Sequence, residues 1–189
     1  MNIKELSENV YEDLNGQIVS VDCQETTVTL FFECDHWKDL DKRISIQIRC
    51  SEVVENAVSP GFSGFLQWED NHPLLLKHNK QHGSLFFTSK PTKPYEVIGI
   101  LYQAHEDLFK GWRPLSDHIN QCGKTNDILA SGSGLLARGP IPVLELYQNS
   151  LEGLIQTNII KSYTPNGGYK ALILDEFFLV CKEVKLTQL

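Results

Sequence analysis

The 189-residue sequence contains little sulfur and no long apolar segment. It has one methionine and five cysteines, an odd number with no Cys-x-x-Cys pair. This spacing fits neither a zinc ribbon nor a disulfide framework, and it predicts reduced thiols without disulfides. No segment approaches the roughly 18 apolar residues of a membrane-spanning helix. The first residues carry alternating charges in place of the apolar core of a signal peptide. We therefore expect a cytoplasmic protein with no membrane partner.

Complete catalytic and metal-binding motifs are also missing. The segment Gly61–Phe65 has a phenylalanine where a nucleophile elbow ends in glycine, and the glycine-rich segment Ser131–Gly134 has no P-loop lysine. His78 and His82 have the spacing of zinc-binding histidines, but the glutamate of His-Glu-x-x-His is absent. These absences favour a binding protein over an enzyme and predict no metal and no cofactor.

The chain contains fewer basic residues than acidic residues. Lys and Arg total 17 against 24 Asp and Glu, so the net charge is −7 and the pI is about 5.3. Because binding to phosphate backbones needs clustered Lys and Arg, this balance argues against nucleic acid as the main ligand. Hydrophobic residues make up 41% of the chain, which is ordinary for a globular protein.

All of the net negative charge lies in the first sixty residues. Residues 1–60 hold 12 acidic and 5 basic residues, whereas residues 61–189 hold 12 of each. The acidic excess is greatest in the segment 33–41, where Asp35, Asp39 and Asp41 surround Trp37. A neutral body with one acidic end creates a field that steers partners during diffusion.

Strict alternation of apolar and polar residues predicts three consecutive strands near the N-terminus. Short links between the strands favour an antiparallel meander. The apolar sets are Val19, Val21 and Cys23; Val28, Leu30, Phe32 and Cys34; and Ile44, Ile46, Ile48 and Cys50. In such a meander Cys34 lies at the end opposite to Cys23 and Cys50. Those two are about 9–10 Å apart, which is too far for a disulfide.

Helical patterns dominate after the proline-rich segment Ser89–Pro94, which is the best candidate boundary. Pro94 is suited to start a helix whose apolar face reaches Phe109, and Pro142 to open another. Asn166-Gly167 indicates a hairpin between residues 155–163 and 169–184. We predict an α+β fold in which an N-terminal antiparallel meander packs with helices of the C-terminal half. The β-rich acidic half would span residues 1–90 and the helical half, with its terminal hairpin, residues 91–189, together forming one compact domain.

The acidic segment is our leading functional hypothesis. If residues 35–42 form the loop between two strands, Trp37 would anchor a basic protein partner while Asp35, Asp39 and Asp41 set orientation and association rate. The simpler alternative is a solvated loop whose tryptophan folds onto the sheet. An EF-hand is excluded, because the spacing Asp35-x3-Asp39-x-Asp41 contains no glycine.

The alternative hypothesis is a small-ligand protein or enzyme with a pocket in the C-terminal half. Its candidate residues are His105, Trp112, Arg113 and Arg138. His105 falls on the apolar face of its predicted helix, where a histidine is usually a hydrogen-bonded core residue. If that face lined a cleft, His105 would act as acid or base and Arg113 as an anion clamp. The sequence leaves the oligomeric state open.

Overall fold

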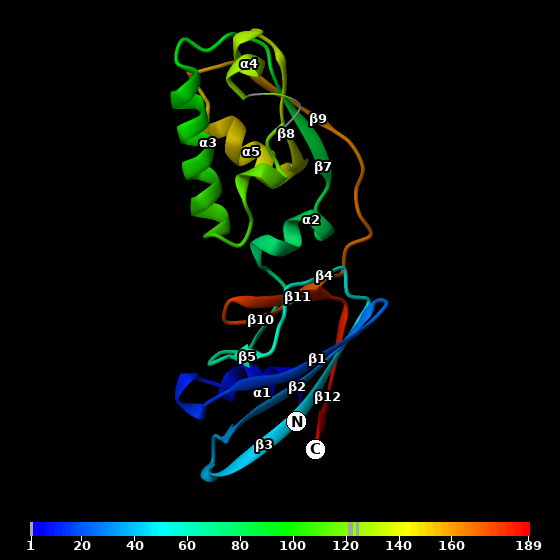
Figure 1. The fold of residues 1–189 in the computed structure, drawn as a ribbon. Helices are drawn as coiled ribbons and strands as arrows, with labels where there is room; N and C mark the ends of the chain where they lie inside the picture. Colours follow the sequence, from blue (N-terminus) through cyan, green and yellow to red (C-terminus); the bar gives the residue numbers. More distant parts are fainter. Residues whose placement is uncertain (1, 121–122, 124) are drawn as a thin grey trace. The chain divides into compact units, whose positions relative to one another are not determined.

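The computed structural model describes residues 2–120, 123 and 125–189, and it divides into two compact units (Figure 1). Met1–Leu75 and Gly168–Leu189 form one, here named the terminal unit, and Leu76–Gly167 form the other, the inserted unit. Each unit combines helices with antiparallel sheet, so the predicted α+β class is confirmed. Among the described residues, no helix has the length and apolar character needed to cross a membrane.

The terminal unit contains a five-stranded antiparallel sheet in the order β12-β3-β2-β1-β5. Helix α1 (Ile3–Asn9) and the 3-10 turn η1 (Glu12–Leu14) precede it and bury Leu6 and Leu14 in its core. The strands are β1 (Gln17–Gln24), β2 (Thr27–His36), β3 (Asp39–Ser51), β5 (Gly61–Phe62) and β12 (Glu183–Gln188).

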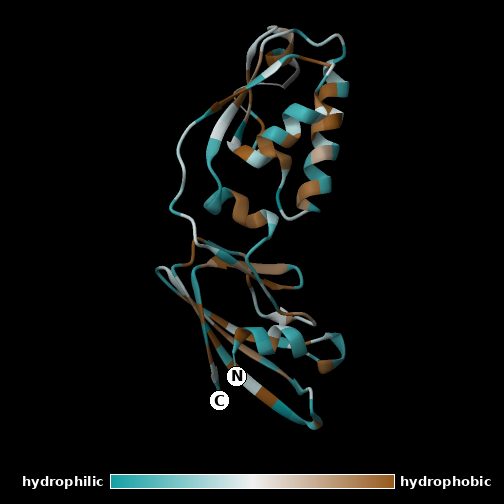
Figure 2. Cartoon of the chain, turned by 180° about the vertical axis from the view of Figure 1, so that it is seen from behind, coloured by the Kyte–Doolittle hydropathy of each residue, from teal (hydrophilic) through white to brown (hydrophobic). Residues whose placement is uncertain are grey.

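Strands β2 and β3 confirm the predicted meander. Their apolar residues are buried at every second position, and the strands alternate between brown and teal in Figure 2. Leu30 lies opposite Ile48, and Phe32 lies opposite Ile46, on the face that packs into the core. One face of this sheet therefore meets the core, as the period of two requires.

Strand β1 differs from the prediction. A register shift between Ile18 and Ser20 places Ile18 in the core and leaves Val19 50% exposed. Val21 still contacts the core, whereas Cys23 is exposed. The predicted core position of Val19 is therefore wrong, because the extra residue in β1 turns the side chains before it to the other face. The predicted core position of Cys23 is also wrong, although Cys23 follows the shift and keeps the same facing as Val21.

A second sheet of the terminal unit has the order β4-β11-β10-β6. Its strands are β4 (Glu55–Asn56), β6 (Gln67–Glu69), β10 (Lys170–Leu174) and β11 (Phe177–Cys181). A hairpin does form in the C-terminal segment, but it joins β10 to β11 through Asp175, whose φ is 53°. The predicted turn at Asn166-Gly167 is wrong, since that segment joins the inserted unit to β10.

The cysteine pattern agrees with the sequence. Cys23, Cys34, Cys50 and Cys181 are free thiols, and Cys122 lies outside the described residues. Val28 pairs with both Cys23 and Cys50, so those two thiols are two strands apart, with Cys34 at the other end of β2. Burial raises the pKa of Cys34 to about 11, which keeps this thiol protonated at neutral pH.

The inserted unit is built on a three-stranded antiparallel sheet in the order β8-β7-β9. Its strands are β7 (His82–Phe87), β8 (Gly134–Pro140) and β9 (Thr157–Lys161), and its helices are α2 (Leu76–Asn79), α3 (Pro94–Phe109), α4 (Thr125–Ala130) and α5 (Ile141–Ser150). Figure 1 shows α5 between α3 and β7. Both predicted proline-led helices are present.

The two units have separate hydrophobic cores. Helices α3 and α5 pack with Leu85 and Phe87 of their own sheet, whereas the meander packs with α1 and with β10 and β11. The helices of the C-terminal half thus share a hydrophobic core with the sheet of their own unit. The segment Ser89–Pro94, expected to divide the chain, lies inside the inserted unit between β7 and α3.

Two glycines provide a matched test of packing. A Cβ at Gly16 would collide with the carbonyl oxygen of Ser63 and the ring of Phe32, whereas one at Gly99 in α3 meets nothing within 4 Å. We expect Gly16→Ala to lower the free energy of unfolding by about 1–3 kcal/mol. Gly99→Ala should raise it by up to about 1 kcal/mol. Urea unfolding followed by circular dichroism measures the free energy of unfolding of both variants. Equal changes in the two variants would contradict the close packing around Gly16.

Candidate functional site

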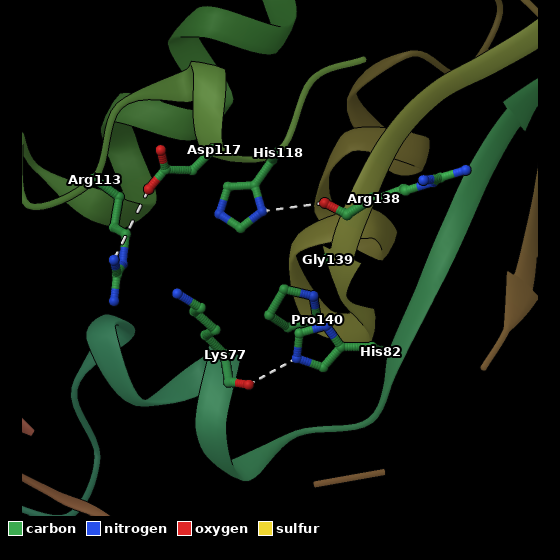
Figure 3. A pocket seen from close by; sticks show the side chains of 8 residues that line it. All are labelled: Lys77, His82, Arg113, Asp117, His118, Arg138, Gly139 and Pro140. Carbon is green, nitrogen blue, oxygen red and sulfur yellow. Dashed lines mark hydrogen bonds and ion pairs between the residues drawn. The ribbon is translucent and has the colours of Figure 1, made fainter. Parts of the chain in front are cut away.

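The inserted unit contains a cavity of about 430 Å³. This volume lies within the usual range for small-molecule sites, roughly 300–1,000 Å³. Figure 3 shows its walls, which come from α2, the start of β7, the 3-10 turn η3 (Leu115–Asp117) with its flanking residues, and the end of β8. The lining residues are Lys77, His82, Arg113, Asp117, His118, Arg138, Gly139 and Pro140.

Two cationic side chains extend into this cavity. Lys77 reaches it from α2, and Arg113 reaches it from the segment before η3 (Figure 3). The Arg113 side chain is only 11% exposed, and its guanidinium lies 3.8 Å from the Asp117 carboxylate. Arg138 lines the cavity through its backbone, because its guanidinium points away from it (Figure 3). Two cations and one carboxylate therefore face the cavity.

His82 braces the wall that carries Lys77. Its Nε2–H donates a hydrogen bond to the backbone carbonyl of Lys77 at 2.7 Å, so Nδ1 is the acceptor in the neutral ring. The hydroxyl of Tyr163 lies 3.4 Å from that nitrogen, and the two rings stack with centroids 4.7 Å apart. Both ring nitrogens of His82 are therefore occupied within the fold, and the residue positions α2.

His105 lies behind the cavity and is fully buried. Its Nε2–H donates to the carbonyl oxygen of Arg113 at 2.7 Å, and the hydroxyl of Tyr147 on α5 donates to Nδ1 at 2.6 Å. Burial raises the pKa of Tyr147, so this group stays a phenol. The interpretation of His105 as a hydrogen-bonded core residue is confirmed, and both of its ring nitrogens are engaged.

His118 is held against the edge of β8. The backbone N–H of Arg138 donates to the His118 carbonyl at 2.8 Å, and Nδ1–H of His118 lies 3.3 Å from the Arg138 carbonyl. Residue His118 is 7% exposed, and its Nε2 has no hydrogen-bond partner among the described residues. Burial lowers the pKa of His118 to about 4, so the ring is neutral at physiological pH.

Charge is divided unequally between the two units. The terminal unit contains 17 acidic and 8 basic residues, a net charge of −9, whereas the inserted unit contains 7 acidic and 9 basic residues, a net charge of +2. The cavity with Lys77 and Arg113 thus belongs to the cationic part of an acidic chain. Its local field favours anions over cations.

The acidic segment of the terminal unit forms strand rather than loop. Strand β2 continues to His36 and β3 begins at Asp39, so the predicted loop 35–42 shrinks to a turn at Trp37 and Lys38. Asp35 lies 3.2 Å from Arg43, and Asp39 lies 2.6 Å from Lys42. These ion pairs weaken the negative field of Asp35 and Asp39, because each of these two carboxylates has a cation beside it.

Trp37 is half-buried at this turn. It packs against the core of the terminal unit and stacks on His36 with ring centroids 5.0 Å apart. Leu40 is 64% exposed beside it, and Asp41 is exposed as well. The tip therefore presents one apolar side chain, Leu40, next to a carboxylate.

The structure brings together part of the predicted pocket. Arg113 and Arg138 line one cavity, His105 supports it from behind, and Trp112 is not among its lining residues. Sequence reasoning missed Lys77 and His118, which no motif connects to Arg113. The described part of the chain contains no group of three or more His, Cys, Asp or Glu that could hold a metal ion.

Comparisons with protein-family models, with curated proteins and with solved structures find no match to this chain. The geometry and charge of the cavity are therefore the observations that bear on function.

The buried neutral state of His118 predicts a pH-dependent stability. Its pKa is about 4 in the fold and about 6.5 in an unfolded chain, so the unfolded state binds more protons between these values. Stability should therefore fall as pH drops from 6.5 to 4, by at most about 1.4 kcal/mol per pH unit from this residue.

The variant His118→Asn removes this contribution while keeping an N–H that can reach the Arg138 carbonyl. Urea unfolding of both proteins across this pH range gives the comparison. Burial also lowers the pKa of His72 in the terminal unit, but that residue is present in both proteins and its effect cancels. Identical pH profiles would show that the fold does not lower the pKa of His118.

Proposed function

We propose that the inserted unit binds a small anionic ligand in the cavity lined by Lys77, Arg113 and His118. The observation that carries this proposal is that two cationic side chains from separate segments extend into one cavity (Figure 3). The Arg113 side chain is only 11% exposed, so water screens its charge less than it screens a surface charge, and an anion in the cavity is attracted more strongly. Asp117 lies 3.8 Å from this guanidinium, and the ammonium of Lys77, an exposed residue, adds a second positive charge to the same cavity.

The positions of the two cations support binding of a defined ligand. Arg113 is restrained through its backbone carbonyl by His105, and the backbone of Lys77 is restrained by His82. These hydrogen bonds fix the backbone from which each cationic side chain extends, so less backbone entropy is lost when a ligand binds. A guanidinium offers a planar pair of N–H donors to a carboxylate or phosphate, and an ammonium adds a compact point charge.

Substitution of the two cations tests this function. We expect Lys77→Met and Arg113→Met each to weaken binding of inorganic phosphate or pyrophosphate about tenfold or more, because each removes a charged hydrogen bond. Isothermal titration calorimetry at constant ionic strength measures the affinity. Arg138→Met is the matched control, because Arg138 lines the same cavity through its backbone while its guanidinium points away from it (Figure 3). This variant therefore removes an equal charge from the unit without removing a group that faces the cavity.

Two results would overturn this proposal. One is equal loss of affinity in Arg138→Met and Arg113→Met, which would indicate a nonspecific charge effect. The other is that the unsubstituted protein binds no small anion. Amide chemical shifts during the titration locate the ligand, and they should change first around Lys77, Arg113 and His118.

Docking of a basic protein partner at the acidic hairpin tip is a second candidate function. The net charge of −9 on the terminal unit favours it, together with Leu40, which is exposed beside Asp41. A partner would be oriented by Asp35, Asp39 and Asp41 and would bury Leu40 and the outer edge of Trp37. This function involves the other unit, so the two proposals can be tested separately.

For this second candidate, Leu40→Ser is the cleaner variant, because Trp37 also packs against the core. We expect Leu40→Ser and Asp41→Asn to reduce capture of a purified basic partner about tenfold without changing the unfolding midpoint. Trp37→Ala should weaken capture by more than about 1 kcal/mol. If Trp37→Ala melts many degrees lower while Leu40→Ser and Asp41→Asn bind normally, the docking hypothesis fails.

A further inference from the structure

One buried nitrogen in the cavity has no hydrogen-bond partner. Among the described residues, Nε2 of His118 is the buried side-chain atom that finds none. A polar atom left unpaired away from water is unfavourable, so folded proteins seldom retain one without a reason. Figure 3 shows this nitrogen on the side of the ring that faces Lys77 and Arg113.

The hydrogen bond at the opposite side of the ring sets the chemistry of Nε2. A backbone carbonyl can only accept, so the contact of Nδ1 with the Arg138 carbonyl at 3.3 Å places the proton on Nδ1. Nε2 then carries a lone pair and no hydrogen. It can accept a hydrogen bond from a ligand, but it cannot donate one to an anionic oxygen.

Close packing holds the ring in this orientation. The ring of Phe109 stacks on the His118 ring, with centroids 5.4 Å apart and an interplanar angle of 22°. The centroid of the His105 ring lies 5.6 Å from the centroid of the His118 ring. On the side of β8, a Cβ at Gly139 would stand 2.5 Å from Nδ1, so only glycine allows the strand to approach. Gly139 also has a φ of 152°, which L side chains rarely adopt. The lone pair is therefore preoriented.

The neighbouring charges restrict the donor that can reach Nε2. The groups facing the His118 ring are His105 on α3, Asp117 beside it, and Arg113 across the cavity. Burial holds the pKa of His118 near 4, so the ring stays neutral and remains an acceptor. Lys77 and Arg113 would repel an ammonium donor, whereas a hydroxyl group carries no charge.

We propose that the cavity selects small anions that also bear a hydroxyl group, with the anionic group held by Lys77 and Arg113 and the hydroxyl donating to Nε2 of His118. This inference rests on the proposed anion-binding function. The shared ligand chemistry is a hydroxylated phosphate monoester or a hydroxycarboxylate, which fits a cavity of about 430 Å³. His118 determines specificity and takes part in no bond-making step.

Two matched pairs of probes test the selectivity and distinguish the anionic groups. Glycerol 3-phosphate is compared with n-propyl phosphate, and tartrate with succinate, by isothermal titration calorimetry. We expect the hydroxylated member of at least one pair to bind about tenfold or more tightly, because its analogue leaves Nε2 unpaired. The pair that binds more tightly identifies phosphate or carboxylate as the anionic group.

The variant His118→Asn is the control for the lone pair. Its amide N–H can still donate to the Arg138 carbonyl, but no atom occupies the position of Nε2. The affinity ratio within each pair should fall to about one in this variant. An unchanged ratio in His118→Asn, or equal binding of both members by the unsubstituted protein, would overturn the inference.

Imidazole nitrogen chemical shifts of the unsubstituted protein give a second measurement that does not require a folded variant. His118 should show the Nδ1–H tautomer, and the resonance of Nε2 should move with glycerol 3-phosphate or tartrate but not with the matched analogue. If anions bind through Lys77 and Arg113 without a preference for hydroxyl groups, only this inference fails. If none of the four probes binds, the anion-binding function fails with it.

Discussion

The cavity depends on the hydrogen bonds of one buried imidazole. His105 lies on α3, accepts from the hydroxyl of Tyr147 on α5, and donates to the carbonyl of Arg113. These contacts join two helices to the segment that carries the cationic side chain of the cavity. The same ring packs beside Phe109 and His118. Loss of this imidazole would leave polar groups unpaired on both sides, so helix packing and cavity geometry are linked.

The division of the chain into two units separates two electrostatic environments. The terminal unit is assembled from both ends of the chain and carries a net charge of −9, while the inserted unit has its own sheet and core and a net charge of +2. The overall charge of −7 therefore conceals a cationic part. The acidic pI describes the total charge of the chain correctly, but it does not indicate that the cationic residues Lys77 and Arg113 share a cavity.

Local patterns predicted those parts of the fold that local chemistry controls. Alternation identified β2 and β3, and prolines located the starts of α3 and α5, because these signals depend on a few neighbouring residues. The sequence pattern does not reveal the bulge in β1. A bulge changes the face of the sheet to which side chains point, but the residue types of the strand carry no signal for it. The residue types place the hairpin turn at Asn166-Gly167, whereas Asp175, in the left-handed conformation, makes the turn between β10 and β11.

The sequence by itself determined the α+β class, the meander, the absence of disulfides among the described cysteines and the buried position of His105, because each follows from residue type and short-range spacing. Only the tertiary structure decided that Lys77, Arg113 and His118 face one cavity, that Arg138 turns its charge away, and that Asp35 and Asp39 lie beside Arg43 and Lys42. The physical reason is that these contacts depend on strand register and on which surfaces pack together. A hydrogen bond such as the one between Nδ1 of His118 and the Arg138 carbonyl joins residues twenty positions apart.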